Sequence, residues 1–147
     1  MKPRIALFLD LENLVHRFRA DGDLAAAVGA IERAVRRVAA RGTIVAAVAC
    51  CDCSLARALV FAMRDMNVRV FTHSGGPDRA DLDLLARIRT DLPASVDTVV
   101  IGSGDHIFTE AARALRAQGL RVELIAPPGA TSADLYRNVD DCILIGS

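Results

Sequence analysis

Lysine is almost absent from this chain. Lys2 is the only lysine among 147 residues, and arginine supplies the rest of the positive charge. This absence excludes two classes of enzyme, because a P-loop needs a lysine after its glycines and a Schiff-base enzyme needs one in its pocket. A haloacid-dehalogenase-like phosphatase would also need a pocket lysine, although Asp10 and Glu12 could imitate its two acids.

Tryptophan, long apolar runs and a net charge are missing as well. No run reaches the roughly 18 apolar residues that cross a bilayer, so we expect no membrane segment. The opening MKPRIALFLDLEN lacks a cleavage site and is expected to form a first strand, which makes the cytoplasm the expected location. Acids and bases balance at 18 each, so any contact with nucleic acid must come from a local patch.

Four cysteines are present, three of them crowded into CCDC at 50–53 and the fourth at Cys142. A zinc ribbon requires two pairs of cysteines with a wider spacing within each pair. We therefore expect the CCDC cysteines to be small apolar residues at the end of a buried strand.

Short apolar runs alternate with stretches of helical periodicity along the whole chain. The runs are apolar on both faces, as parallel strands covered on both sides require. Their positions are 5–9, 44–50, 68–71, 98–101, 122–125 and 142–145. This alternation predicts an α/β fold, a three-layer Rossmann-like sandwich with a mostly parallel sheet of about five or six strands, in one domain spanning 1–147.

The stretches between the strands predict helices. One covers 24–38, one begins after a capping Ser54, two cover 81–89 and 105–118, and a short one follows Thr131 or Ser132. The sequence Ser74-Gly75-Gly76-Pro77 is expected to be a flexible loop.

Acidic residues stand where three of the expected strands end. Asp10 ends the first strand, Asp81 follows the third, and Asp105 follows the fourth after a Gly-Ser-Gly turn. Ligands of an open parallel sheet bind at this carboxyl edge, so we expect the three carboxylates to meet there. Each acid alone would also suit a helix cap or a turn.

Three carboxylates that converge repel one another unless a cation neutralises them. Hard oxygen ligands suit Mg²⁺ or Mn²⁺, which activates water for attack on a phosphodiester. The pattern therefore predicts Asp10, Asp81 and Asp105 as metal ligands and catalytic residues of a Mg²⁺ or Mn²⁺ site.

Four segments together resemble a known family. ALFLDLENL is similar to the opening strand of the NYN domain, in the LabA-like branch of the PIN-like nucleases, with Asp10 and Asn13 on its signature acid and amide. DRADLDLLARI resembles the second motif and places Asp81, while VVIGSGDHIF resembles the third and places Ser103 and Asp105. ATSADLYRNVDDCI resembles the closing segment, so the match covers nearly the whole chain in order.

The resemblance implies a divalent-metal-dependent ribonuclease. Asn13 and Ser103 would bind substrate with Arg79 and His106, although the last two equally suit an exposed surface. Few aromatic residues are present for base stacking, so we expect single-stranded RNA to be held through its phosphates with little sequence preference. The alternative is a catalytically weak or inactive RNA-binding or regulatory module, or a dimerising partner, and a homodimer is possible in either case.

Two positions depart from the family's pattern. The third motif usually carries a second acid where this chain has Ile107, and the second motif a further acid where it has Arg87. An Ile107→Asp change should tighten metal binding if position 107 faces the site. It should only destabilise the protein if the isoleucine packs into the core.

Overall fold

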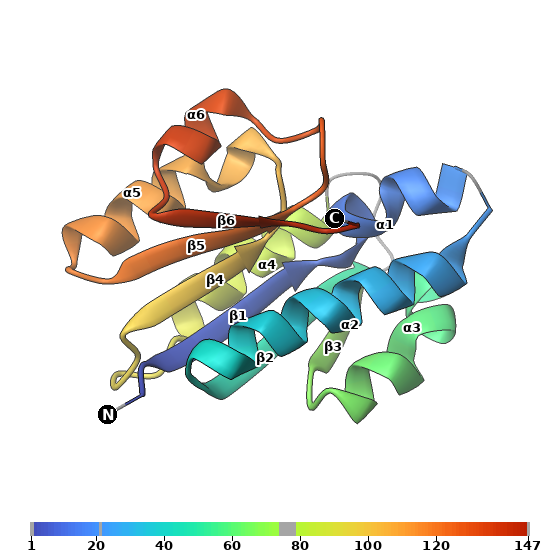
Figure 1. Ribbon diagram of the computed structural model, residues 1–147, viewed down its shortest axis with the longest axis horizontal. Coiled ribbons are helices and arrows are strands. Elements are labelled where there is room, and N and C mark those ends of the chain that lie inside the picture. Colours follow the sequence, from blue (N-terminus) through green and yellow to red (C-terminus); the bar gives the residue numbers. More distant parts are fainter. Residues whose placement is uncertain (1, 21, 74–78, 147) are drawn as a thin grey trace.

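The computed structural model describes residues 2–20, 22–73 and 79–146 as an α/β sandwich around one six-stranded sheet (Figure 1). Every strand pairs in parallel with its neighbour, in the order β3-β2-β1-β4-β5-β6. The strands are β1 (Arg4–Asp10), β2 (Thr43–Asp52), β3 (Arg69–His73), β4 (Thr98–Gly102), β5 (Arg121–Ala126) and β6 (Asp141–Leu144). This Rossmann-like order confirms the predicted fold class.

Helices cover both faces of the sheet. On one face pack α1 (Leu11–Ala20), α2 (Leu24–Arg41) and α3 (Cys53–Asp65). On the other pack α4 (Arg79–Thr90), α5 (Thr109–Ala117), with a 3₁₀ turn at His106–Phe108 before it, and α6 (Ala133–Arg137). The sandwich therefore has the three layers expected from the sequence.

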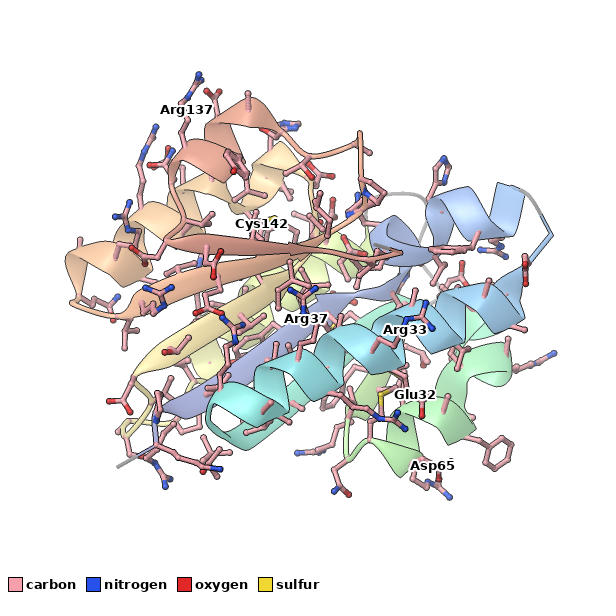
Figure 2. All side chains as sticks on the ribbon, viewed as in Figure 1. Glu32, Arg33, Arg37, Asp65, Arg137 and Cys142 are labelled. Carbon is pink, nitrogen blue, oxygen red and sulfur yellow. The ribbon has the colours of Figure 1, made fainter. Side chains whose placement is uncertain are left out.

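The central strand β1 shows why strands that are apolar on both faces lead to a sheet covered by helices on both sides. Its side chains alternate between faces, so Ile5, Leu7 and Leu9 pack against the α1–α3 layer, while Ala6 and Phe8 pack against the α4–α6 layer. Helix α2 is apolar on the sheet side only, and Arg33 and Arg37 project from its outer side (Figure 2). Cys50 and Cys51 are buried in β2, as expected, but Cys53 is exposed and begins α3, so the expectation was wrong for the third cysteine of CCDC.

Three further local features differ from the sequence prediction. Helix α1 was not expected, since its apolar residues follow the first strand without a break. Helix α3 is capped by Asp52, whose carboxylate accepts the N–H of Leu55, and not by Ser54. The helix predicted for 105–118 begins as the 3₁₀ turn, which Asp105 caps.

The predicted Ser74-Gly75-Gly76-Pro77 loop lies outside the described residues, as does Asp78. Among the described residues, no helix is long and apolar enough to cross a membrane.

Candidate functional site

A pocket of about 320 Å³ opens at the carboxyl edge of the sheet. Its lining consists of Asp10, Glu12, Asn13, His16, Asp81, Asp105, Pro127 and Ala130. The pocket forms here because β1 and β4 are neighbours, with Leu9 paired to Gly102, so the residues that follow the two strands meet. Helix α1 leaves the end of β1 at the same edge (Figure 1). The three predicted acids therefore line one pocket.

Asn13 connects the end of β1 to the turn after β4 through two hydrogen bonds. Its own N–H donates to Oδ1 of Asp10 at 3.2 Å, and its side-chain Oδ1 accepts the N–H of Gly104 at 2.9 Å. The carbonyl of Gly104 in turn accepts the N–H of Ser132 at 2.8 Å, which holds the segment that contains Ala130 against the pocket. Asn13 thus shapes the pocket through the backbone.

Asp10 is the most deeply buried acid of the pocket, with only 3% of its surface exposed. Burial raises the pKa of its carboxyl to about 7, against the opposing effect of the N–H of Asn13. The negative charges of Asp81, Glu12 and Asp105 raise the pKa further, in that order. Near neutral pH this carboxyl therefore gains strongly from any cation that enters the pocket.

Asp81 and Asp105 reach the pocket from the other layer. Asp81 lies buried in the first turn of α4, and its Oδ1 accepts the N–H of Leu82 at 2.7 Å. Asp105 caps the 3₁₀ turn, its Oδ1 accepting the N–H of Ile107 at 3.1 Å. Both carboxylates are held by backbone donors, which fixes their positions at the pocket wall.

The pocket's donors are carboxylate and amide oxygens, the ligand type that Mg²⁺ and Mn²⁺ prefer. Among the described residues, no three acidic, histidine or cysteine side chains approach closely enough to enclose an ion directly. Mg²⁺ usually keeps several waters and is bound through one or two carboxylates. The residues therefore fit an ion held by Asp10 and a second acid, with water between the ion and the remaining acids.

Three predicted substrate-binding residues do not line the pocket. Ser103 is fully buried, and its hydroxyl accepts the N–H of Asp105 at 3.1 Å, so it supports the turn. Arg79 is exposed and lies 3.9 Å from Asp83. His106 is exposed beside the pocket, with Nδ1 3.2 Å from Oδ1 of Asp105. Their contact with substrate stays a prediction.

The two departures from the family's pattern have structural explanations. Ile107 is half-buried and packs against the core of the α4–α6 layer, which includes Phe108. The guanidinium of Arg87 lies 3.5 Å from the ring centroid of Phe71 and donates to Asp91 at 3.1 Å. Neither side chain lines the pocket, so both positions serve packing in this chain.

This packing decides what we expect of Ile107→Asp. The variant should lose about 1–3 kcal/mol of unfolding free energy, because it places a carboxylate among apolar side chains. Thermal melts with and without Mn²⁺ measure this, with Ile107→Val as the control for lost volume alone. A melting temperature that Mn²⁺ restores would place position 107 at the metal site instead.

Sequence reasoning overlooked several pocket residues. Glu12 and His16 lie in α1, the helix that was not expected, and Pro127 and Ala130 come from the segment after β5. His73, at the end of β3, lies next to Glu12. The spacing of Asp10, Glu12 and His16, two and then four residues, was the available signal for α1 side chains at the strand end.

The fold and the pocket define a class: a Rossmann-like α/β protein with acids gathered where its parallel strands end. The sequence matches the NYN domain over residues 4–146, and the chain therefore belongs to the NYN domain family. No curated protein matches it significantly.

A solved structure shares the fold. The crystal structure of a protein of unknown function from Vibrio parahaemolyticus superposes with a TM-score of 0.80 at 19% sequence identity. The similarity covers 99% of this chain and 94% of that one.

Proposed function

We propose that this chain is a divalent-metal-dependent ribonuclease that hydrolyses RNA phosphodiester bonds in the acidic pocket. One observation carries the proposal: Asp10, Asp81 and Asp105 line the same pocket. The burial of Asp10, which raises the pKa of its carboxyl to about 7, agrees with it. Membership of the NYN family, a family of PIN-like nucleases, supports it. Such a pocket repels a phosphate group until a cation neutralises it.

Each residue has a role in this proposal. Asp10, Asp81 and Asp105 would hold Mg²⁺ or Mn²⁺, two of them directly and the third through water, and the ion would activate water and offset charge on the leaving oxygen. Asn13 keeps the strand ends at a fixed separation, and Ser103 supports the backbone at Asp105. His106 and Arg79, exposed near the pocket, contact the phosphates on either side of the cleaved bond.

Cleavage of a labelled single-stranded RNA by the purified protein tests the proposal. With Mn²⁺ present we expect cleavage that EDTA abolishes and that Asp105→Asn reduces at least about 100-fold, since the variant removes charge where the transition state needs the ion. Asp134→Asn, an exposed acid paired with Arg137 on α6, is the matched control and should cleave normally. Equal cleavage by the wild type and Asp105→Asn would point to a contaminating nuclease.

RNA binding should depend on salt and on metal. The chain has no tryptophan and only one tyrosine, so phosphate contacts rather than base stacking would dominate. We expect affinity for a single-stranded oligonucleotide to fall steeply between 50 and 200 mM salt, roughly tenfold or more, and to vary little with base composition. Fluorescence anisotropy measures this, and the same assay on Asp10→Asn, which should not bind the metal, tests the dependence on metal. Tight binding that does not weaken with salt, or that depends strongly on base sequence, would contradict the prediction.

A second candidate function is an RNA-binding or regulatory NYN module without catalysis. Ile107 and Arg87 favour it, because both occupy positions where the family usually has acids and both are engaged in packing. The same cleavage assay separates the two: RNA that binds in a metal-dependent way and remains intact would support the module.

A further inference from the structure

We propose that Glu12 is a further metal ligand of the acidic pocket, bound directly or through water, and that buried His73 positions it. The inference rests on the proposed metal site and adds two residues to it. In this inference Glu12 supplies the additional carboxylate that the family usually has where this chain has Ile107.

The geometry brings Glu12 to the pocket from the turn after β1. It lies in the first turn of α1, two residues after Asp10, and its side chain forms part of the pocket wall with Asp81 and Asp105. The side chain is 28% exposed, which leaves it open to a solvated ion. Its negative charge also acts on Asp10, where it contributes to the raised pKa. Glu12 is therefore electrostatically part of the same group of acids.

His73 provides an independent observation. It ends β3, and its side chain is only 7% exposed, with Nε2 3.3 Å from Oε1 of Glu12. Among the described residues, neither ring nitrogen of His73 nor Oε1 of Glu12 has a hydrogen-bond partner. Buried polar atoms are normally satisfied, and Oε1 of Glu12 is approached by His73 without a well-formed hydrogen bond, so this oxygen keeps a lone pair for a cation.

The arrangement matches the way proteins orient metal ligands. When an imidazole and a carboxylate are in contact, one of them binds the ion and the other holds it in the orientation that binding requires. To contact Glu12, the side chain of His73 must cross the end of β2. His73 is paired with Asp52 at the end of β2, and β2 lies between β3 and β1. The ring of His73 thus extends past the end of β2 to the start of α1. Asp52 itself is engaged as the cap of α3.

Other charged groups near the pair are accounted for. Arg19 of α1 lies 3.7 Å from Asp52, so its charge is directed to that residue. His16, one turn after Glu12, lines the pocket but is exposed. Among the described side chains, no arginine or lysine lines the pocket with Glu12. A cation in the pocket therefore has no resident positive charge to displace.

Titration of the metal-free full chain with Mn²⁺, followed by the EPR signal of free Mn²⁺, tests the inference without relying on activity. We expect Glu12→Gln, which keeps the volume of the side chain, to weaken Mn²⁺ binding about 10-fold or more. Glu110→Gln is the matched control: Glu110 also lies in the first turn of a helix, α5, but is 82% exposed and paired with Arg113. It should bind Mn²⁺ like the wild type.

The role of His73 is tested by a pair of variants. His73→Leu should weaken Mn²⁺ binding about 10-fold by releasing Glu12, and His73→Gln, which retains a donor nitrogen, should recover most of the loss. A purely structural role would make both variants melt earlier but leave the Mn²⁺ affinity of the folded protein unchanged. Circular dichroism before each titration establishes that the sample is folded.

The outcomes separate this inference from the proposed function. If the wild type binds Mn²⁺, Asp10→Asn abolishes binding and Glu12→Gln leaves it unchanged, the inference is overturned and the metal site stands. If the wild type binds no Mn²⁺, both are overturned. If Glu12→Gln weakens binding while both His73 variants bind like the wild type, the role of Glu12 stands and that of His73 is overturned.

Discussion

Asp10→Asn should make the metal-free protein more stable at pH 8 while it abolishes Mn²⁺ binding and reduces any RNA cleavage at least about 100-fold. The two effects have one cause. The carboxyl of Asp10 is 3% exposed and lies near three other acids, so its ionised form is destabilised until a cation arrives. An asparagine retains an oxygen for the N–H of Asn13 and carries no charge to bury.

The sign of the pH dependence follows from the raised pKa. Because the carboxyl in the folded protein titrates at about 7 rather than at 3.8, the folded state holds its proton more tightly than the unfolded state. The ionisation of Asp10 therefore leaves the stability of the wild type unchanged below about pH 3.8, lowers it as the pH rises to about 7, and has no further effect above that pH. The difference between a pKa of 3.8 and one of about 7 corresponds to a destabilisation of at most roughly 4 kcal/mol at pH 8.

Denaturant unfolding of the two proteins at pH 5 and pH 8, in EDTA, measures this effect. We expect the advantage of Asp10→Asn to be larger at pH 8, and Mn²⁺ to stabilise only the wild type. Asp65→Asn, an exposed acid at the end of α3, is the control and should change stability by less than about 0.5 kcal/mol at either pH. A variant that is less stable than the wild type at pH 8 would contradict the burial of an ionised Asp10.

Gly104→Ala should damage the pocket and the fold together. A β-carbon at this position would lie 2.8 Å from the carbonyl oxygen of Ala130 and 3.0 Å from Cα of Thr131, and both atoms belong to the backbone. The segment that closes the pocket would have to move away, which would strain the hydrogen bonds of Gly104 to Asn13 and Ser132. We expect a loss of about 1–3 kcal/mol of unfolding free energy and weaker Mn²⁺ binding.

Gly29→Ala is the matched control for this change. Gly29 lies within α2, where a new β-carbon would meet only the flexible end of Arg33 at 3.3 Å. Alanine at this place should stabilise the protein by about 0.5–1 kcal/mol through helix propensity and leave Mn²⁺ binding unchanged. If Gly104→Ala behaves in the same way, close approach of the 130–131 backbone is not required for the pocket.

The sheet could be predicted from the sequence because its strands are buried on both faces. Runs such as Ile5–Leu9 within β1 are apolar at every position, as strands of a parallel sheet with helices on both faces require. Helix α1 escaped prediction for a related reason. Its buried residues Leu11, Leu14 and Val15 continue the apolar run of β1, and no glycine or proline separates strand from helix. The capping residue is Asp10, whose carboxylate accepts the N–H of Asn13, and the sequence pattern indicates it only as the acid at the end of the strand.

The acids of the candidate site could be predicted because topology alone gathers them. Asp10, Asp81 and Asp105 each follow a strand of a parallel sheet, and such strands end at one edge. The contact between Glu12 and His73 could not be predicted in this way. It depends on how far the imidazole reaches across the end of β2, which is a matter of side-chain conformation that no sequence pattern records.

The position of β1 between β2 and β4 also governs the order of folding. One edge of β1 pairs with β2, which follows soon in the chain, but the other pairs with β4, which begins only at Thr98 of 147 residues. Contacts of such high sequence separation close slowly, and during synthesis they must wait until the ribosome has released most of the domain. A nascent chain that ends before Thr98 carries Asp10 on a strand with one open side. The acidic pocket therefore forms late in folding, and an ion that binds there stabilises a chain that has already folded.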